Sequence, residues 1–296
     1  MNKKNKIITI GIPTYNEEKN IIKFFESLKK QNIESNSIDK ILFVDDSEDN
    51  TPELINKLKI ENPSLKIELI HNNKRMGASN AWNTIFKESN GEVIILLDAD
   101  IELEKDCIVN LTSKINENTG LCASNTQPII QNDNKFSKAS AFIAFWLRSI
   151  RQHGVSRYTT MGRALALNSE YVKYLEIPIN IIAIDLYIQC KILENQKNVV
   201  YNDDAVIYFK TPSTMPDFLG QVTRAIIGHN QIKKLTKKCS PNIPFLILLK
   251  EFLINSFRYP NYVLALMYCY SMLPYSYFKT KKNVSYLWQT ASSTKE

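Results

Sequence analysis

The sequence has 296 residues, of which 44% are hydrophobic and 10% aromatic, so the chain can bury a substantial core and is not a disordered protein. Its formal net charge of +7 favours anionic ligands, among them phosphates, nucleic acids and acidic membrane surfaces. The five cysteines lack the spacing of a zinc finger or a disulfide framework, which favours a reducing compartment. Because Pro13 interrupts the first apolar run, we expect no secretory signal and a cytoplasmic location.

The first hundred residues alternate between predicted strands and predicted helices. Apolar runs predict buried strands at residues 6–12, 40–44, 65–71 and 93–97. Apolar residues at helical spacing predict helices at residues 17–30, 51–60 and 78–89. The second of these helices also has Thr51 as a candidate N-cap, with Pro52 at the first helical position. This alternation predicts an α/β fold with a mostly parallel sheet flanked by helices.

The pattern is less regular further along the chain. We expect helices at residues 105–116, 136–151 and 183–195, and extended segments at 120–124, 159–167 and 199–209. These elements complete a predicted first domain over residues 1–215. The remaining residues, 216–296, are first basic and then apolar, which predicts a helical extension.

Two acids, Asp98 and Asp100, directly follow the apolar run at residues 93–97. Ligands of open α/β sheets bind at the carboxyl ends of the strands, so both acids are expected at a binding edge. An Asp-x-Asp sequence offers hard oxygen ligands that suit Mg²⁺ or Mn²⁺ held partly by phosphates. The alternative is a solvated turn, since acids commonly follow strands.

Polar clusters also follow the three other early strands, at residues 13–17, 45–46 and 73–77. In a parallel sheet these ends meet at one edge, so we expect the clusters to share a site with Asp98 and Asp100. Lys74 and Arg75 precede Gly77, and a cation beside a flexible backbone suits a diphosphate. The alternative is an ordinary solvated loop.

In this order, the Pro-x-Tyr-Asn-Glu turn, the Asp-Asp pair, the Asn- and Gly-containing stretch and the Asp-x-Asp resemble the motifs of the family 2 glycosyltransferases with the GT-A fold. The resemblance covers residues 8–224. It implies metal-dependent transfer of a sugar, with inversion, from a nucleoside-diphosphate sugar to a hydroxyl of a glycan or a lipid-linked acceptor. A UDP-sugar is the commonest donor of such families, and guanosine remains open.

The resemblance also implies roles for single residues. The turn that packs on the base and ribose corresponds to Pro13, Thr14, Tyr15 and Glu17. One of Asp45 and Asp46 would hydrogen-bond the base, Asp98 would contact the ribose, and Asp100 would bind the metal. Each of these residues has capping or turn formation as its alternative role.

Asp185 resembles the second acid of the family's Glu-Asp segment, which acts as the catalytic base. Here Ile184 stands in place of the first acid, so the role of base depends on Asp185 alone. A single base without a second nucleophilic carboxylate implies direct displacement with inversion. The alternative is that Asp185 only stabilises the start of a helix.

Three further positions follow from the resemblance. Gly162 lies in a segment similar to the one near the acceptor, where it permits close backbone approach or else forms a tight turn. Gln221 and Arg224 resemble the Gln-x-x-Arg-Trp region and are candidates to contact diphosphate or acceptor. Ala225 replaces the tryptophan, which weakens the inference of a processive polymerase. A separate candidate is His229, which either approaches the metal or is a surface or packing residue.

Residues 243–282 are apolar but interrupted by charges, prolines and tyrosines, and are flanked by basic residues. This composition favours helices lying on a membrane surface, with a membrane span and packing on the first domain as alternatives. We therefore expect peripheral attachment at the cytoplasmic face of a membrane.

Two other functions are compatible with parts of the sequence. A sugar-phosphate nucleotidyltransferase also uses acids at a sheet edge with a nucleotide and a metal, but it gives no role to Asp185. A non-catalytic module could bind nucleic acid through the lysines at 233–238, but the run is short and has no interleaved aromatic residues. We expect a solvated helix face there and no nucleic-acid partner.

Overall fold

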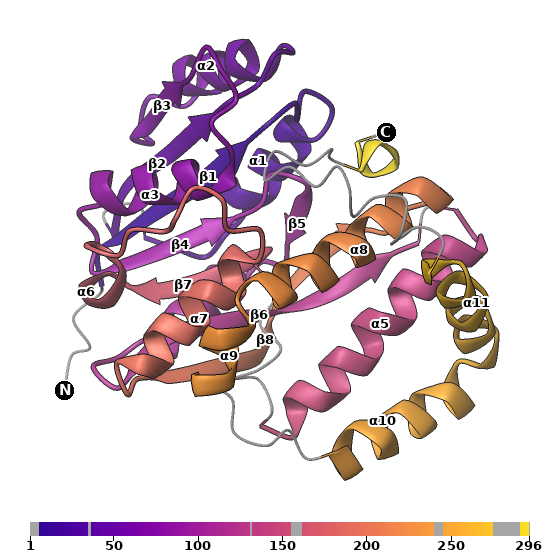
Figure 1. Cartoon of the computed structure of the whole chain (residues 1–296). Coiled ribbons are helices and arrows are strands. Elements are labelled where there is room, and N and C mark those ends of the chain that lie inside the picture. Colours follow the sequence, from indigo (N-terminus) through magenta and orange to yellow (C-terminus); the bar gives the residue numbers. More distant parts are fainter. Residues whose placement is uncertain are drawn as a thin grey trace.

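The computed structural model describes residues 6–34, 37–130, 132–154, 162–239, 245–274 and 291–295. Its strands are β1 (Ile8–Thr14), β2 (Ile38–Asp45), β3 (Ile67–His71), β4 (Val93–Leu97), β5 (Ile101–Leu103), β6 (Thr119–Ile129), β7 (Ala164–Asn168) and β8 (Asn198–Lys210). Its helices are α1 (Ile21–Lys29), α2 (Thr51–Glu61), α3 (Ala78–Glu88), α4 (Cys107–Ser113), α5 (Lys135–Gln152), α6 (Ser169–Val172), α7 (Ile184–Glu194), α8 (Met215–Gln231), α9 (Lys233–Cys239), α10 (Phe245–Arg258) and α11 (Pro260–Ser271). A 3₁₀ turn covers Ser292–Thr294. Figure 1 shows how these elements are arranged.

Within the described residues, the strands form one sheet in the order β3-β2-β1-β4-β7-β6-β8-β5. The pairs β3-β2, β2-β1, β1-β4 and β6-β8 are parallel, which confirms the predicted, mostly parallel α/β fold. β7 pairs antiparallel with β4 and β6, and β5 pairs antiparallel with β8. β7 therefore does not bring its carboxyl end to the edge where β1, β2 and β4 end. Leu97 pairs with Ala164, so β7 brings its amino end there.

Both faces of the sheet are covered, which explains the continuous apolar sequence of β4. Ile94 and Leu96 pack in a cluster that includes residues of α3 and α7. Ile95 and Leu97 pack in a second cluster, with residues of α1, α2 and α4. Since each successive side chain of a strand points to the opposite face, every residue of β4 is buried. The buried sheet is the rigid element that positions the loops at its edge.

β6 is longer than its sequence predicted, because it continues through buried polar residues to Ile129. The Nδ2 of Asn125 donates to the backbone carbonyl of Asp203 over 2.8 Å, and the Nε2 of Gln127 donates to Asn125. These bonds satisfy side chains that a hydrophobic pattern assigns to the surface. β5 and α6 are too short to give a periodic signal, and the sequence analysis missed both.

Helices α10 and α11 of the extension pack on α5 (Figure 1), whereas α9 packs on α7 and α8. Phe252 of α10 makes edge-to-face contacts with Phe142 and Trp146, and Tyr259 stacks on Phe145 with ring centroids 4.7 Å apart. In the part of the chain that the structure describes, no helix combines the length and apolar character needed to cross a bilayer. Residues 275–282 of the predicted membrane segment, like 159–161 of the predicted strand, lie outside the described residues.

An ion pair joins α5 to β8. The guanidinium of Arg148 donates to both carboxylate oxygens of Asp203, over 2.9 and 2.8 Å, and the hydroxyl of Tyr201 donates to one of them over 2.5 Å. The hydrogen bonds from Arg148 lower the pKa of Asp203 from 3.8 to about 2. A lowered pKa gives stability that is complete above the ordinary value and is lost as pH falls toward 2.

We therefore expect Asp203→Asn to lower the free energy of unfolding by about 1 kcal/mol at pH 7, a small value because the pair is partly exposed. The difference from the unmodified protein should shrink below pH 4. Urea unfolding at pH 7 and pH 3 measures both quantities. Asp204→Asn, at the exposed neighbouring position, is the control. Equal stability of the two variants at pH 7 would contradict the role of the pair.

Candidate active site

The ends of β1, β2 and β4 and the start of β7 meet at one edge of the sheet. The backbone N–H of Asp46 donates to the carbonyl of Thr14 over 3.0 Å, and that of Asp98 donates to the carbonyl of Arg163 over 2.9 Å. The predicted clusters therefore lie at a common edge, and the antiparallel β7 adds Arg163 to them.

Asp45 and Asp46 are both engaged by the protein itself. Asp45 is fully buried and accepts hydrogen bonds from the hydroxyls of Thr14 and Ser47, over 2.6 and 2.5 Å. Its second oxygen lies 2.7 Å from the Nδ1 of His71. His71 is the last residue of a predicted strand, but it was not predicted as a site residue. The arrangement holds the ends of β1, β2 and β3 together. Contact of Asp45 with a base remains a prediction.

Asp46 holds the loop between β3 and α3. One of its oxygens accepts from the backbone N–H groups of Met76 and Gly77, over 2.8 and 2.7 Å, and the other accepts from Asn72. A carboxylate bound by several N–H groups fixes a loop firmly. Asp46 and Gly77 are thus in contact, in line with the expectation that their two clusters share a site. Lys74, in the same loop, is exposed to solvent.

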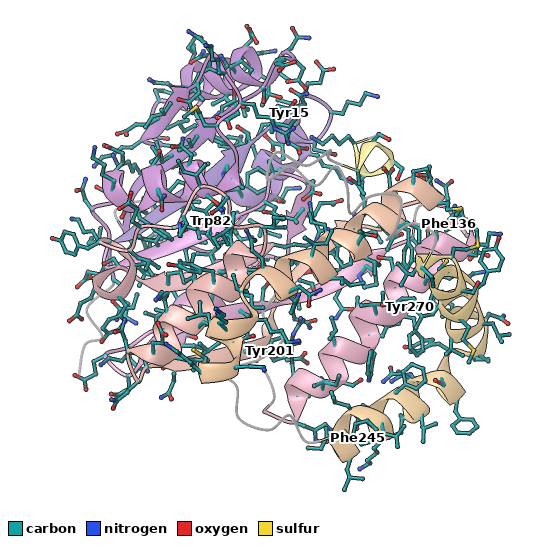
Figure 2. All side chains as sticks on the ribbon, in the orientation of Figure 1. Tyr15, Trp82, Phe136, Tyr201, Phe245 and Tyr270 are labelled. Carbon is teal, nitrogen blue, oxygen red and sulfur yellow. The ribbon has the colours of Figure 1, made fainter. Side chains whose placement is uncertain are left out.

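Tyr15 lies in the turn after β1 (Figure 2), and the guanidinium of Arg75 stacks over its ring, 3.8 Å from the centroid. Pro13 precedes this turn within β1, where it pairs with Val44. Glu17 closes the turn and accepts a hydrogen bond from Asn20 over 2.9 Å. Burial, with Asp100 as a further contribution, raises the pKa of Glu17 to about 6. The turn therefore presents an aromatic ring under a cation.

Asp98 and Asp100 face Arg163, a residue that the sequence analysis passed over. The Nη1 of Arg163 donates to both oxygens of Asp100, over 3.1 and 3.3 Å, and lies 4.0 Å from Asp98. Its guanidinium also stacks on Phe209, 4.5 Å from the ring centroid. Burial and the neighbouring Asp100 raise the pKa of Asp98 to about 8. The available signal was an arginine next to Gly162 within the predicted extended segment at residues 159–167.

The acid pair fits a divalent cation in its chemistry. Two carboxylates two residues apart supply hard oxygen ligands, and a further positive charge there would counteract the burial and the repulsion from Asp100 that raise the pKa of Asp98. Among the described residues, no group of three or more His, Cys, Asp or Glu side chains could hold a metal ion. An ion at Asp100 would therefore take its other ligands from phosphates or water, as Mg²⁺ commonly does.

Asp185 lies in the first turn of α7, as predicted. Burial raises its pKa, and the backbone N–H groups of Leu186 and Gly162 and the charges of His229 and Arg224 act in the opposite direction. A buried carboxylate with a raised pKa is a candidate general base. His229 itself bonds the carbonyl of Ala225 on α8 over 2.7 Å and is within electrostatic reach of Asp185.

Arg224 connects the two groups of acids. Burial lowers its pKa, and the charges of Asp98, Asp185 and Asp100 counteract this effect. Arg224 is therefore within electrostatic reach of the Asp-x-Asp acids and of Asp185 together. Gln221 lies one turn earlier on α8, on the same side of the helix. That Gln221 and Arg224 contact the diphosphate or the acceptor stays a prediction.

Gly162 leaves almost no space beside Asp185. A Cβ added to Gly162 would lie 3.0 Å from the Cβ and 3.4 Å from the Cγ of Asp185. We expect Gly162→Ala to displace the carboxylate by a few tenths of an ångström and to lower kcat about tenfold with little loss of stability. Steady-state kinetics and thermal unfolding measure both. Gly220→Ala on α8, with nothing within 4 Å, is the control: its kcat should equal that of the unmodified protein, and its melting temperature should be equal or slightly higher because alanine favours a helix.

The sheet, its edge and the covering helices are those of the GT-A fold. The sequence profile described as glycosyl transferase family 2 matches residues 9–169, more than half of the chain. The chain therefore belongs to glycosyl transferase family 2.

Curated relatives match part of the chain. The chain is 30% identical to a dolichol-phosphate mannosyltransferase of Pyrococcus furiosus over 108 residues. This match covers 36% of this chain and 30% of that protein. The chain is 27% identical to the poly(ribitol-phosphate) β-N-acetylglucosaminyltransferase TarS of Staphylococcus aureus over 109 residues. This match covers 37% of this chain and 19% of that protein. The matches thus span less than a third of the length of either relative.

Solved structures match over nearly the whole chain. The mannosyltransferase PcManGT of Pyrobaculum calidifontis, in complex with GDP-Man and Mn²⁺, superposes with a TM-score of 0.66 at 20% identity, over 94% of this chain and 80% of that one. S. aureus TarS in complex with UDP-GlcNAc superposes with a TM-score of 0.56 at 16% identity, over 93% and 90% of the two chains. At these identities the likeness shows the fold.

Proposed function

We propose that this protein is an inverting glycosyltransferase that moves a sugar from a nucleoside-diphosphate sugar to an acceptor hydroxyl, with Asp185 as the base. The observation that carries the proposal is the contact of Arg163 with Asp100 and Asp98 at the edge of the sheet, with Arg224 within electrostatic reach of these acids and of Asp185. It supports a single site in which a diphosphate and an attacking hydroxyl meet.

In this proposal Asp185 accepts the proton of the acceptor hydroxyl as its oxygen attacks the anomeric carbon. The bond from that carbon to the diphosphate breaks at the same time, so an α-linked donor gives a β-linked product. Arg163 and Arg224 stabilise the charge that develops on the leaving diphosphate. When bound at Asp100, Mg²⁺ or Mn²⁺ would neutralise further negative charge. The turn at Tyr15 and the loop held by Asp46 would hold the nucleoside.

For the donor we propose a UDP-sugar, with a GDP-sugar as the alternative, since the two structural relatives were solved with GDP-Man and UDP-GlcNAc. Thermal unfolding with a panel of nucleotide sugars, with and without Mn²⁺, tests the choice. A donor at 100 times its Kd stabilises the native state by about 2.7 kcal/mol. Failure of every nucleotide sugar to raise the melting temperature would contradict the proposal.

Product analysis separates this activity from that of a nucleotidyltransferase. A sugar transferase releases a nucleoside diphosphate, whereas a nucleotidyltransferase releases or consumes pyrophosphate. Incubation with the stabilising nucleotide sugar, followed by anion-exchange chromatography, identifies the product.

We also propose that residues 243–282 lie on an anionic membrane surface beside a glycan or lipid-linked acceptor. Large apolar side chains on α10 and α11 are exposed, among them Leu246 at 78% and Phe257 at 86%. Figure 2 shows Phe245, the first residue of α10, at the periphery of the molecule. Lys250 and Arg258 on α10 supply positive charge. Such helices favour the membrane interface. We further propose that the boundary between the first domain and the extension lies between residues 215 and 216.

Flotation with lipid vesicles tests this attachment. The protein should float with vesicles containing phosphatidylglycerol and much less with phosphatidylcholine alone, and a Leu246→Ser, Phe257→Ser double variant should float less. Equal recovery of both proteins in the vesicle fraction would exclude α10 as the contact.

A further inference from the structure

Residues 291–295 lie against the donor-binding side of the sheet. Figure 1 shows this short yellow segment beside α1, far in sequence from the strands that it approaches. Ser293 and Thr294 are buried, with 4% and 3% of their surface exposed. A short segment is buried to this degree only when specific contacts hold it, and the structure shows contacts to two separate parts of the site.

The first set of contacts reaches the turn after β1. The ammonium of Lys295 donates to the backbone carbonyls of Tyr15 and Asn16, over 2.5 and 2.6 Å, and forms an ion pair with Glu17 at 2.8 Å. The side chains of Lys295 and Glu17 are only 16% and 12% exposed. All three donor positions of one ammonium are thus used by three consecutive residues, which fixes the turn.

The second set of contacts reaches the start of α8, the helix that carries Gln221 and Arg224. The backbone N–H of Ser293 donates to Asp217 over 2.9 Å, and the hydroxyl of Ser293 accepts from the N–H of Ser213 over 3.1 Å. The side chain of Asn20 donates to the carbonyl of Thr294 over 3.5 Å. The segment therefore bridges the β1–α1 turn and α8.

We infer that residues 291–295 complete the donor site by joining the nucleoside-binding turn to the helix that carries Arg224, and that Lys295 is a positioning residue for donor binding. The inference rests on the proposed function, because it assigns the turn to the nucleoside. Lys295 acts through the turn: its ammonium is used by Tyr15, Asn16 and Glu17.

Loss of this ammonium leaves two carbonyls and a partly buried carboxylate without their cation. Such groups cost free energy unless they move toward water, so the turn would rearrange. A rearranged turn binds the nucleoside less well, whereas Asp185 and its surroundings at the start of α7 are unchanged. The expected effect falls on donor affinity, and kcat at saturating donor should change less than threefold.

The experiment compares Lys295→Met with Lys295→Arg and with Lys237→Met, a control at an exposed lysine of α9. Calorimetry with UDP and with GDP, each with Mn²⁺, measures nucleotide affinity in the full chain. Hydrogen–deuterium exchange of the peptide covering residues 13–20 measures the rigidity of the turn without any nucleotide.

We expect Lys295→Met to weaken the Kd of the bound nucleotide about tenfold and to speed exchange in this peptide, Lys295→Arg to recover part of both, and Lys237→Met to change neither. Unchanged affinity and exchange in Lys295→Met would overturn the positioning role while leaving the proposed function intact. Faster exchange with unchanged affinity would also overturn it, since the segment would then stabilise the fold alone. Failure of the unmodified protein to bind either nucleotide would overturn the proposed function and, with it, this inference.

Discussion

Replacement of Asp185 by asparagine is expected to lower kcat about a thousandfold, the middle of the range for loss of a general base. Asparagine has nearly the same shape and keeps an oxygen that can accept from the N–H groups of Leu186 and Gly162. It cannot take a proton from an attacking hydroxyl at neutral pH. The KM for the donor and the melting temperature should stay close to those of the unmodified protein. Release of nucleoside diphosphate, followed at saturating donor, measures the effect.

The matched control is Glu194→Gln, at the other end of the same helix. Glu194 pairs with Lys191 at the surface and should contribute little to stability and nothing to transfer. Turnover by Asp185→Asn within tenfold of the control would remove Asp185 from the role of base.

The second large effect is expected from Asp100→Asn. The variant removes one negative charge from the acid pair and leaves Arg163 without its main partner. If Asp100 holds the divalent cation of the donor diphosphate, kcat/KM should fall at least a hundredfold, because the metal contributes several kcal/mol of charge stabilisation. In the unmodified protein, Mn²⁺ should add to the increase in melting temperature that a nucleotide sugar gives. In Asp100→Asn this additional increase should disappear.

Glu102→Gln is the control for this experiment, since Glu102 lies two residues further on and pairs with Lys23 at the surface. Circular dichroism confirms that both variants are folded. Retention by Asp100→Asn of the full Mn²⁺-dependent stabilisation would show that another group holds the ion.

The two variants separate binding from chemistry. Asp185→Asn should bind donor and metal normally and fail in transfer, whereas Asp100→Asn should already fail in binding the donor with its metal. If instead Asp185→Asn lost donor and metal binding and Asp100→Asn lost only transfer, the roles of the two acids would be reversed. Both acids are within electrostatic reach of Arg224.

The sequence by itself determined the α/β alternation and the acids at the strand ends. Strands buried on both faces are mostly apolar, so β1 and β4 were visible as runs, and the polar residues after them marked the binding edge. The helix predicted at residues 183–195 likewise placed Asp185 near the start of a helix, and the resemblance to the family singled it out. These features depend on residues close together in the chain.

The tertiary structure alone decided which distant residues complete the site. Arg163 reaches Asp100 because β7 runs antiparallel to β4, and strand direction is set by pairing across the sheet, which leaves no local sequence signal. Burial of the polar residues of β6 likewise depends on hydrogen bonds from Asn125 to β8. Lys295 meets Glu17 across most of the chain, and a contact of that sequence separation exists only once the sheet and α8 have folded.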